Sequence, residues 1–367
     1  MLFALAIGGI AWFIVAYRYQ AWDFRNNLWG PARLLLEGKD PYSLEALAQL
    51  SVEWGVPFFR SIWFPTIIGV GLPLGVLPWP NAANIWLLIS LAAALVSTVL
   101  VYAATTKRQQ SRDLLAVALS VMLFVPLYSH LNQGQVSLVV LASCVIGWAL
   151  LEGDRPVWAG ALLSLGWAKP QLVILVWPAL AWLAVKRGRG CSFLLGWLAG
   201  SVAQTIPLWI LDPSWPAGYL EALRANVTWL QPNLYSLAAY WSGSQILGWT
   251  VALVALGAAG SWLAGLWRRS DNLGALTWTL ALTPILSPYT WSYDQVLILP
   301  LLALIMSRGR RGLPRTVWWI VFVICMAMCV ALRLQTGSDV WYAWLPPVLL
   351  AISAWLAPPG KRDESER

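Results

Sequence analysis

Charged residues are scarce in this chain of 367 residues: Asp, Glu, Lys and Arg together make up 11% of it, against 59% hydrophobic residues. The apolar residues form repeated continuous runs, many of them near the ~20 residues that a helix needs to cross a hydrocarbon layer. Alternation of polar and apolar residues, the pattern of a membrane strand, is missing, so the runs indicate helices and not a barrel. The composition therefore predicts an integral membrane protein.

Several binding signatures are also absent. The chain has no zinc motif, phosphate-binding loop or dinucleotide fingerprint, and its four cysteines lie in or beside apolar runs. Those positions favour buried free thiols over disulfides or a metal site. Basic residues occur in short clusters such as 186–189 and 308–315, so the net charge of +8 does not indicate a nucleic-acid partner. We expect no cofactor and no protein ligands for a metal, although assistance by a divalent metal is left open.

The order of the apolar runs predicts an all-α, polytopic protein with about twelve transmembrane helices. The runs are 2–17, 81–102, 113–129, 136–151, 156–168, 171–185, 191–211, 244–267, 273–289, 295–307, 316–334 and 341–357. A further apolar stretch, 65–80, carries four prolines and is short, which predicts a re-entrant or interfacial segment. Excluding it from the count places every basic cluster on the cytoplasmic side, as the positive-inside rule requires.

This topology predicts a single transmembrane domain over 1–357 in the cell membrane, followed by a cytoplasmic tail over 358–367. Both termini are expected in the cytoplasm, and two long outer loops are expected at 18–80 and 212–243. No inner loop is long enough to fold into a nucleotide-binding domain. Because the outer loops carry carboxylates, arginines, amides and aromatic residues, the chemistry is expected on the extracytoplasmic face.

The first outer loop begins with an acid, Asp23, between Trp22 and Phe24. An aspartate in a loop is commonly a helix N-cap or a surface partner of an arginine, here Arg25. At a membrane boundary beside aromatic residues, however, partial desolvation would raise its basicity and suit the abstraction of a proton from a sugar hydroxyl. Asp23 is therefore the candidate general base.

A second motif, 128–135, connects two apolar runs on the outer side and contains the only histidine, His130. A short turn needs polar residues and glycine for conformational reasons alone. This one also has Asn132, Gln133 and Gln135, and three amides with an imidazole exceed the hydrogen-bonding capacity that a tight turn requires. The excess favours a role in binding substrate.

Two further motifs place charge at outer ends of helices. Lys169, beside Gln171, is either an anchor whose ammonium snorkels to the headgroups or a ligand of a phosphate. Asp294 either caps the next helix, orients an acceptor hydroxyl or holds a lysine or arginine. Arg224 in the second long loop is a second candidate phosphate ligand. The candidate substrate-binding residues are Arg25, His130, Asn132, Gln133, Gln135, Gln171, Trp291, Tyr293 and Asp294.

In their order and spacing these motifs resemble glycosyltransferase family 87. The residues that carry the resemblance are Asp23-Phe24, Gly38 to Tyr42, Asn132 to Val136, Ala168 to Gln171 and Ser287 to Asp294. The family consists of polytopic enzymes of the C-type glycosyltransferase fold and includes α-mannosyltransferases that use polyprenyl-phosphate mannose. In the last motif those mannosyltransferases tend to carry a histidine, where this chain has Tyr293-Asp294.

The resemblance implies a polyprenyl-phosphate sugar as donor, with mannose favoured, and an acceptor glycolipid or glycan in the outer leaflet. It implies inversion at the anomeric carbon, Asp23 as the general base, and stabilisation of the departing phosphate by Lys169 and Arg224. Membrane lipids would surround the enzyme as further partners.

Two other functions are open at this point. A secondary transporter or flippase would place ionisable groups and broken helices at the bilayer midplane, often in inverted repeats. A non-catalytic assembly subunit would tolerate the replacement of Asp23. Convergence of Asp23, His130, Lys169 and Asp294 on one cavity would favour the enzyme.

Overall fold

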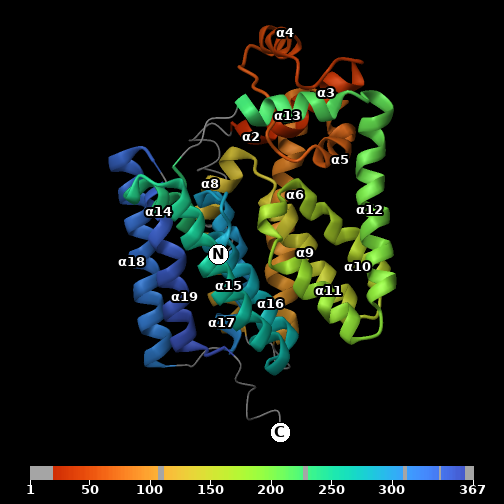
Figure 1. Cartoon of the computed structure of the whole chain (residues 1–367). Coiled ribbons are helices and arrows are strands. Elements are labelled where there is room, and N and C mark those ends of the chain that lie inside the picture. The colour runs from red at the N-terminus through yellow and green to blue at the C-terminus, as the bar shows by residue number, and fades with distance from the viewer. Residues whose placement is uncertain (1–19, 106–110, 226–229, 309–311, 339, 360–367) are drawn as a thin grey trace.

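The computed structural model describes residues 20–105, 111–225, 230–308, 312–338 and 340–359. Within these ranges all regular secondary structure is helical, and no strand occurs (Figure 1). The predicted first span, 2–17, lies outside the described residues, as does most of the predicted tail. The all-helical fold class is confirmed.

Four helices among the described residues are long and apolar enough to cross a membrane. They are α6 (Trp79–Thr105), α12 (Gly190–Leu211), α15 (Gln245–Arg269) and α18 (Leu313–Thr336). At 1.5 Å per residue, α6 rises about 40 Å and α12 about 33 Å, enough for a ~30 Å hydrocarbon layer. A fifth span results if α7 (Ser111–Leu123) and α8 (Val125–Gln133), which meet at a bend of 56°, are counted together.

The remaining predicted runs form shorter helices, several of which are broken. The α-helical parts are α9 (Ser137–Glu152), α10 (Pro156–Leu163), α11 (Val176–Lys186), α16 (Asn272–Leu286), α17 (Leu299–Arg308) and α19 (Leu345–Leu356). Tighter 3-10 turns interrupt them at η2 (Ser164–Ala168), η3 (Pro170–Leu172), η4 (Ser292–Ile298) and η5 (Val340–Trp344). The count of about twelve spans is therefore not confirmed and stays a prediction.

The segment predicted as the first outer loop is a cap of short helices at one end of the molecule (Figure 1). It contains α2 (Trp22–Phe24), the π-helix η1 (Arg25–Trp29), α3 (Gly30–Leu36), α4 (Leu44–Trp54) and α5 (Thr66–Gly75). Local signals set these helices: Ser43 accepts a hydrogen bond from the Ala46 amide at the start of α4, and Gly55 ends it in the left-handed conformation. The second long loop is likewise helical, with α13 (Trp215–Ala225) and α14 (Leu234–Ser242).

The proline-rich stretch forms α5, which has ten residues and rises only about 15 Å, too short to cross a membrane. It packs against α3 and α12. The contact with α12 is close, because a Cβ added at Gly69 would lie 2.2 Å from the Gln204 carbonyl oxygen. This short packed helix accords with a re-entrant or interfacial segment.

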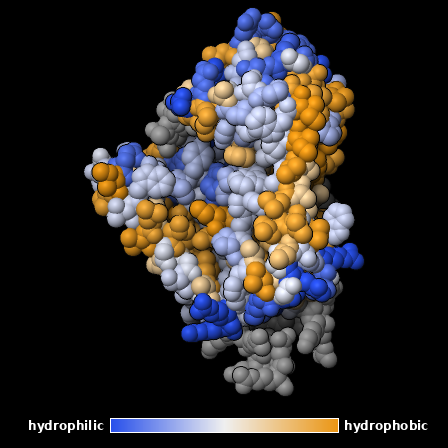
Figure 2. All heavy atoms as spheres, turned by 45° about the vertical axis from the view of Figure 1, so that its right-hand side comes forward, coloured by the Kyte–Doolittle hydropathy of each residue, from blue (hydrophilic) through white to orange (hydrophobic). Residues whose placement is uncertain are grey.

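The end of the molecule opposite the cap carries the described basic clusters. Arg187 pairs with Glu152, Arg189 with Asp154, and Arg308 with Asp271. These pairs join the end of α9 to the turn between α11 and α12, and the start of α16 to the end of α17. Between the two ends, the face drawn in Figure 2 gathers hydrophobic residues in its middle, with hydrophilic residues at the cap and at the base. Such a belt is typical of a membrane protein.

Candidate active site

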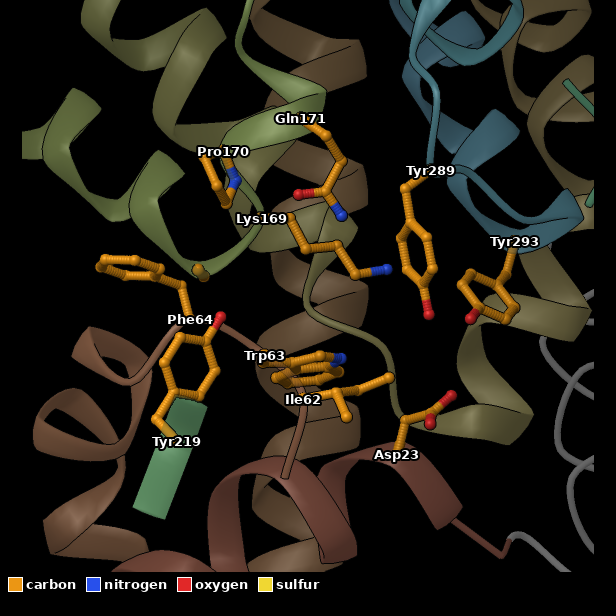
Figure 3. Close-up of a pocket in the computed structure, with 11 residues that line it drawn as sticks. Asp23, Ile62, Trp63, Phe64, Lys169, Pro170, Gln171, Tyr219, Tyr289 and Tyr293 are labelled. Atoms are coloured by element: carbon orange, nitrogen blue, oxygen red, sulfur yellow. The ribbon is translucent and has the colours of Figure 1, made fainter. Parts of the chain in front are cut away.

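A cavity of about 100 Å³ lies beneath the cap, where helices distant in sequence meet (Figure 3). Its polar lining comes from the cap and from the break between α10 and α11, and its remaining walls are mostly aromatic. The lining residues are Asp23, Ile62, Trp63, Phe64, Ala168, Lys169, Pro170, Gln171, Tyr219, Tyr289 and Tyr293.

The position of Asp23 follows from how α2 rests on the turn after α8. The Ala21 amide donates to the Asn132 carbonyl at 3.0 Å. Gly134, with φ +66°, packs so closely that an added Cβ would lie 2.8 Å from Phe24. This contact aims the Asp23 carboxylate at Gln135, whose amide nitrogen donates to it. The N-cap interpretation of Asp23 is wrong, because Ala21 occupies the N-cap of α2.

The surroundings of Asp23 change its acidity. Burial raises the pKa of Asp23 to about 6, and the negative charge of Asp294 acts in the same direction. The charge of Lys169 and the hydrogen bond from Gln135 lower the pKa and so limit the rise. A carboxylate with a pKa near 6 is ionised at neutral pH and is more basic than an ordinary aspartate, which suits a general base.

Lys169 and Asp294 form a buried ion pair at the cavity wall, with 2.8 Å between Nζ and Oδ1. Ser137 joins the pair: Lys169 donates to its hydroxyl at 3.3 Å, and that hydroxyl donates to Asp294. The other Asp294 oxygen accepts from the Trp291 amide at 2.9 Å. Asp294 therefore both caps η4 and holds the lysine. The surface-anchor interpretation of Lys169 is wrong, since its side chain is almost fully buried and lines the cavity.

A break in the helical backbone brings Lys169 to this position. The chain passes from α10 into the 3-10 turn η2, and Lys169 itself is extended at φ −143° and ψ 78°, because the residue before a proline is kept out of the helical region. Its Nζ lies 4.8 Å from the centre of the Tyr293 ring and 5.9 Å from that of Trp63. Irregular backbone of this kind at membrane depth is tolerated where it lines a cavity.

The motif around His130 differs from the expected turn. Residues 125–133 form α8, and the turn is confined to Gly134 and Gln135. His130 is fully buried behind the wall, near the backbone of Tyr293 and Gln135, and does not line the cavity. Asn132 and Gln133 also lie away from the lining, whereas Gln135 reaches Asp23.

Three other candidate residues lie outside the cavity lining. Arg25 is buried among aromatic rings, with its guanidinium carbon 4.8 Å from the centre of the Trp22 ring. Trp291 packs its ring against Tyr293 at 6.2 Å. Arg224 is exposed at the end of α13, and it is Tyr219 from this helix that reaches the cavity. Gln171 and Tyr293 do line it, as expected.

The structure brings to the site several residues that the sequence pattern did not predict. Trp63 and Phe64 come from the segment before α5, and Tyr219 packs its ring edge-on against Phe64 at 5.9 Å. Ser137 at the start of α9 looked like an ordinary first residue of an apolar run. Tyr289 lies within the motif from Ser287 to Asp294, so its neighbours in sequence could have indicated it. No local pattern distinguished the others from the many interfacial aromatic residues.

Among the residues that the structure describes, no group of three or more His, Cys, Asp and Glu side chains is placed to hold a metal ion.

The model of glycosyltransferase family 87 matches residues 65–288, well over half of the chain. The chain belongs to glycosyltransferase family 87. It is accordingly a membrane glycosyltransferase, which supports an enzyme over a transporter or an assembly subunit. No curated protein and no solved structure matches it. The matched region contains Gln135 and Lys169 but neither Asp23 nor Asp294, so the fold is what unites all four at one site.

Proposed function

We propose that this member of glycosyltransferase family 87 transfers a sugar from polyprenyl phosphate to a glycolipid or glycan acceptor on the extracytoplasmic face. Mannose is the favoured sugar, as the resemblance of the motifs implies. The observation that carries the proposal is that a basic carboxylate, Asp23, and a buried ammonium group, Lys169, line one cavity. Transfer from a sugar phosphate needs both, since one group must accept a proton from the acceptor hydroxyl and the other must stabilise the negative charge on the departing phosphate.

In the proposed reaction the oxygen of an acceptor hydroxyl attacks the anomeric carbon of the donor, and Asp23 accepts the proton of that hydroxyl. The bond between that carbon and the phosphate oxygen breaks, and the electron pair leaves with the polyprenyl phosphate. Attack on the face opposite the leaving group inverts the configuration. The charge that develops on the phosphate is stabilised by Lys169, whose burial strengthens the interaction.

Asp294 and Ser137 serve in this scheme to position Lys169. Before the donor binds, Asp294 compensates the lysine charge, and Ser137 keeps both polar ends hydrogen-bonded. Without such partners a charged side chain buried in this apolar wall would lack compensation for its lost hydration. A donor phosphate approaching from the cavity then meets an ammonium group already held in place.

The aromatic walls suit a sugar, whose apolar ring face stacks on aromatic side chains. Trp63, Tyr289 and Tyr293 border the space between Lys169 and Asp23, and Tyr219 lines the cavity beside Phe64 (Figure 3). The cavity is smaller than the ~300–1,000 Å³ of sites that enclose a whole drug-sized ligand. A cavity of about 100 Å³ holds only part of the two substrates, so the remainder of each stays outside it.

The proposed orientation places the cap outside and the basic end in the cytoplasm, as the positive-inside rule favours. The pairs around Glu152 and Asp271 mark that inner end. In this orientation, both termini are cytoplasmic and residues 1–357 form one domain in the cell membrane.

Radiolabelled polyprenyl-phosphate mannose, glucose and arabinose, offered with membrane lipid extract to the purified full chain, test the proposal. We expect transfer from one donor, abolished in Asp23→Asn and retained in Asp40→Asn, a matched change at an exposed aspartate of the cap. Absence of transfer from every donor, or equal transfer by Asp23→Asn and the wild type, would contradict it.

A further inference from the structure

A second hollow, an apolar groove of about 690 Å³, runs along α11 and the first turns of α12, apart from the active-site cavity. Its walls include Trp177, Ala181 and Val185 of α11 and Phe193, Leu194 and Trp197 of α12. The groove is open at the side, since Val185 and Leu194 are 66% and 52% exposed. Figure 1 shows α11 and α12 at one edge of the molecule, which faces lipid in a membrane. Hydrocarbon chains are therefore the natural filling of this groove.

Positively charged residues beside one end of the groove favour an anionic lipid over a neutral one. The groove reaches the turn between α11 and α12, where Gly188 and Gly190 line it, at the basic end of the molecule. Arg187 and Arg189 beside this turn are paired with acids. Lys186 is exposed, with its Nζ 5.0 Å from the centre of the Trp182 ring, and it has no ion-pair partner among the residues the structure describes. A ligand with apolar chains and an anionic head matches both features.

We propose that this groove binds an acidic phospholipid from the leaflet at the basic end, with its acyl chains against Trp177 and Trp197 and its phosphate near Lys186. The inference is independent of the transfer reaction. An anionic headgroup at this level is attracted by the positive charge of Lys186, which the neighbouring acids leave uncompensated. The snorkelling lysine stem lets the ammonium group follow the headgroup plane.

The chain of a polyprenyl-phosphate donor is the rival occupant, and the packing disfavours it. The Trp167 ring lies between the groove and the cavity, 4.8 Å from Trp177, 5.5 Å from Trp197 and 5.2 Å from Phe64 of the cavity wall. A donor whose phosphate contacts Lys169 would have to pass this aromatic cluster. It would also leave Lys186, next in sequence to the groove residue Val185, without an anion.

Cys191 provides a probe at the groove itself. It lines the groove and is exposed, whereas Cys144, Cys325 and Cys329 are buried. The purified full chain in neutral detergent is labelled with a maleimide dye in the presence of phosphatidylglycerol, phosphatidylcholine or polyprenyl phosphate at equal concentration. We expect phosphatidylglycerol to slow the labelling of Cys191 about fivefold more than phosphatidylcholine or polyprenyl phosphate does.

Variants then separate the headgroup contact from the chain contact. Lys186→Gln should remove most of the preference for phosphatidylglycerol, Lys186→Arg should keep it, and Arg269→Gln, an exposed basic residue at the same end but outside the groove, should not change it. Trp197→Leu should weaken protection by both phospholipids. Trp209→Leu, an exposed tryptophan on the same helix outside the groove, is its control.

Three outcomes would overturn the inference. Equal protection of Cys191 by the two phospholipids would contradict the proposed headgroup contact. Absence of protection by either would contradict the proposed binding site. If polyprenyl phosphate protected Cys191 from labelling most strongly, and equally in Lys186→Gln, the occupant of the groove would be the polyprenyl chain of the donor. None of these results depends on sugar transfer, so failure here and failure of the proposed reaction are distinguishable.

Discussion

Ion pairs occur at both ends of this protein, but their burial differs. At the basic end the side chains of Arg189 and Asp154 are 51% and 65% exposed, whereas those of Lys169, which lines the cavity, and Asp294, which lies behind it, are 4% and 1% exposed. A solvated pair contributes ~0–1 kcal/mol to stability. A buried pair loses several kcal/mol of hydration per ion, which its mutual attraction only partly offsets.

The difference teaches which charges are structural and which are functional. The pairs at the basic end join helix termini in a solvated layer, where charge costs little. The candidate site instead holds two charged groups at the cavity, Asp23 and Lys169, and a third behind it, at a cost in stability. Gln135, Ser137 and the Trp291 amide donate hydrogen bonds to the two carboxylates. Groups kept charged or shifted in pKa under such conditions are typical of active sites.

The largest expected effect is on the rate of sugar transfer, which should depend on the charge at the cavity and not on the charge at the basic end. Asp23→Asn should lower kcat by about 10²- to 10⁴-fold, because an amide cannot accept the proton of the attacking hydroxyl. Asp154→Asn, the same change at the basic end, should alter kcat less than twofold. Initial rates of sugar transfer with purified protein measure both. If Asp23→Asn keeps more than a tenth of the wild-type rate, another group is the base.

The second effect is on the free energy of unfolding, which should depend more on the buried ion pair than on the exposed pairs at the basic end. Lys169→Met should lower the free energy of unfolding by about 3–5 kcal/mol, because it leaves the Asp294 carboxylate buried without its partner. Arg189→Gln at the basic end should cost about 1 kcal/mol or less. Denaturant unfolding in detergent, followed by tryptophan fluorescence, makes the comparison.

A double variant sharpens this test. Lys169→Met with Asp294→Asn should recover most of the lost stability, because neither position of the pair then carries an uncompensated buried charge, while transfer stays as low as in Lys169→Met alone. Recovery of transfer along with stability would show that Lys169 has only a structural role.

The third effect concerns pH. With a pKa of about 6, Asp23 is protonated and inactive as a base below that value, so transfer should rise through about pH 6 to a plateau. Gln135→Leu removes a hydrogen bond that lowers this pKa, so the rise should move to higher pH. Gln133→Leu, which alters an amide outside the cavity, should leave the profile in place. A rise at the same pH in both variants would show that Gln135 does not act on the base.

The raised pKa of Asp23 also affects stability: its contribution to stability falls with increasing pH, whereas the transfer rate rises. The folded pKa of Asp23 lies above its unfolded value near 4, so the folded state binds the proton more tightly. The resulting contribution to stability is fully present below about pH 4 and is lost as the pH rises through about 6. Asp23→Asn should abolish this part of the pH dependence of unfolding, which denaturant midpoints across pH 4–7 would measure.

The smallest expected effect concerns Arg224. Because Arg224 is exposed and does not line the cavity, Arg224→Gln should change the KM for the donor less than twofold. Kinetics over a range of donor concentrations measure it. A tenfold rise in KM would restore Arg224 as a phosphate ligand and bring the end of α13 into the site.

The candidate site was partly predictable from local sequence. Asp23, Lys169 and Tyr293 stood out because polar residues at the ends of apolar runs are costly and few, and the cavity contains all three. His130 stood out for the same reason, and Arg224 as a cation in the second long loop, yet His130 is buried behind the wall and Arg224 is exposed. Local pattern identifies unusual residues but not the direction in which their side chains point.

What the sequence determined by itself is the helical membrane class, the position of most helices and the family. These follow from local properties, because a run of apolar residues partitions into lipid and forms a helix whatever lies elsewhere in the chain. What only the tertiary structure decided is the site: the contact of Asp23 with Gln135, 112 residues away, and of Lys169 with Asp294, 125 residues away. Such contacts depend on how broken helices pack against one another, and no single segment carries that information.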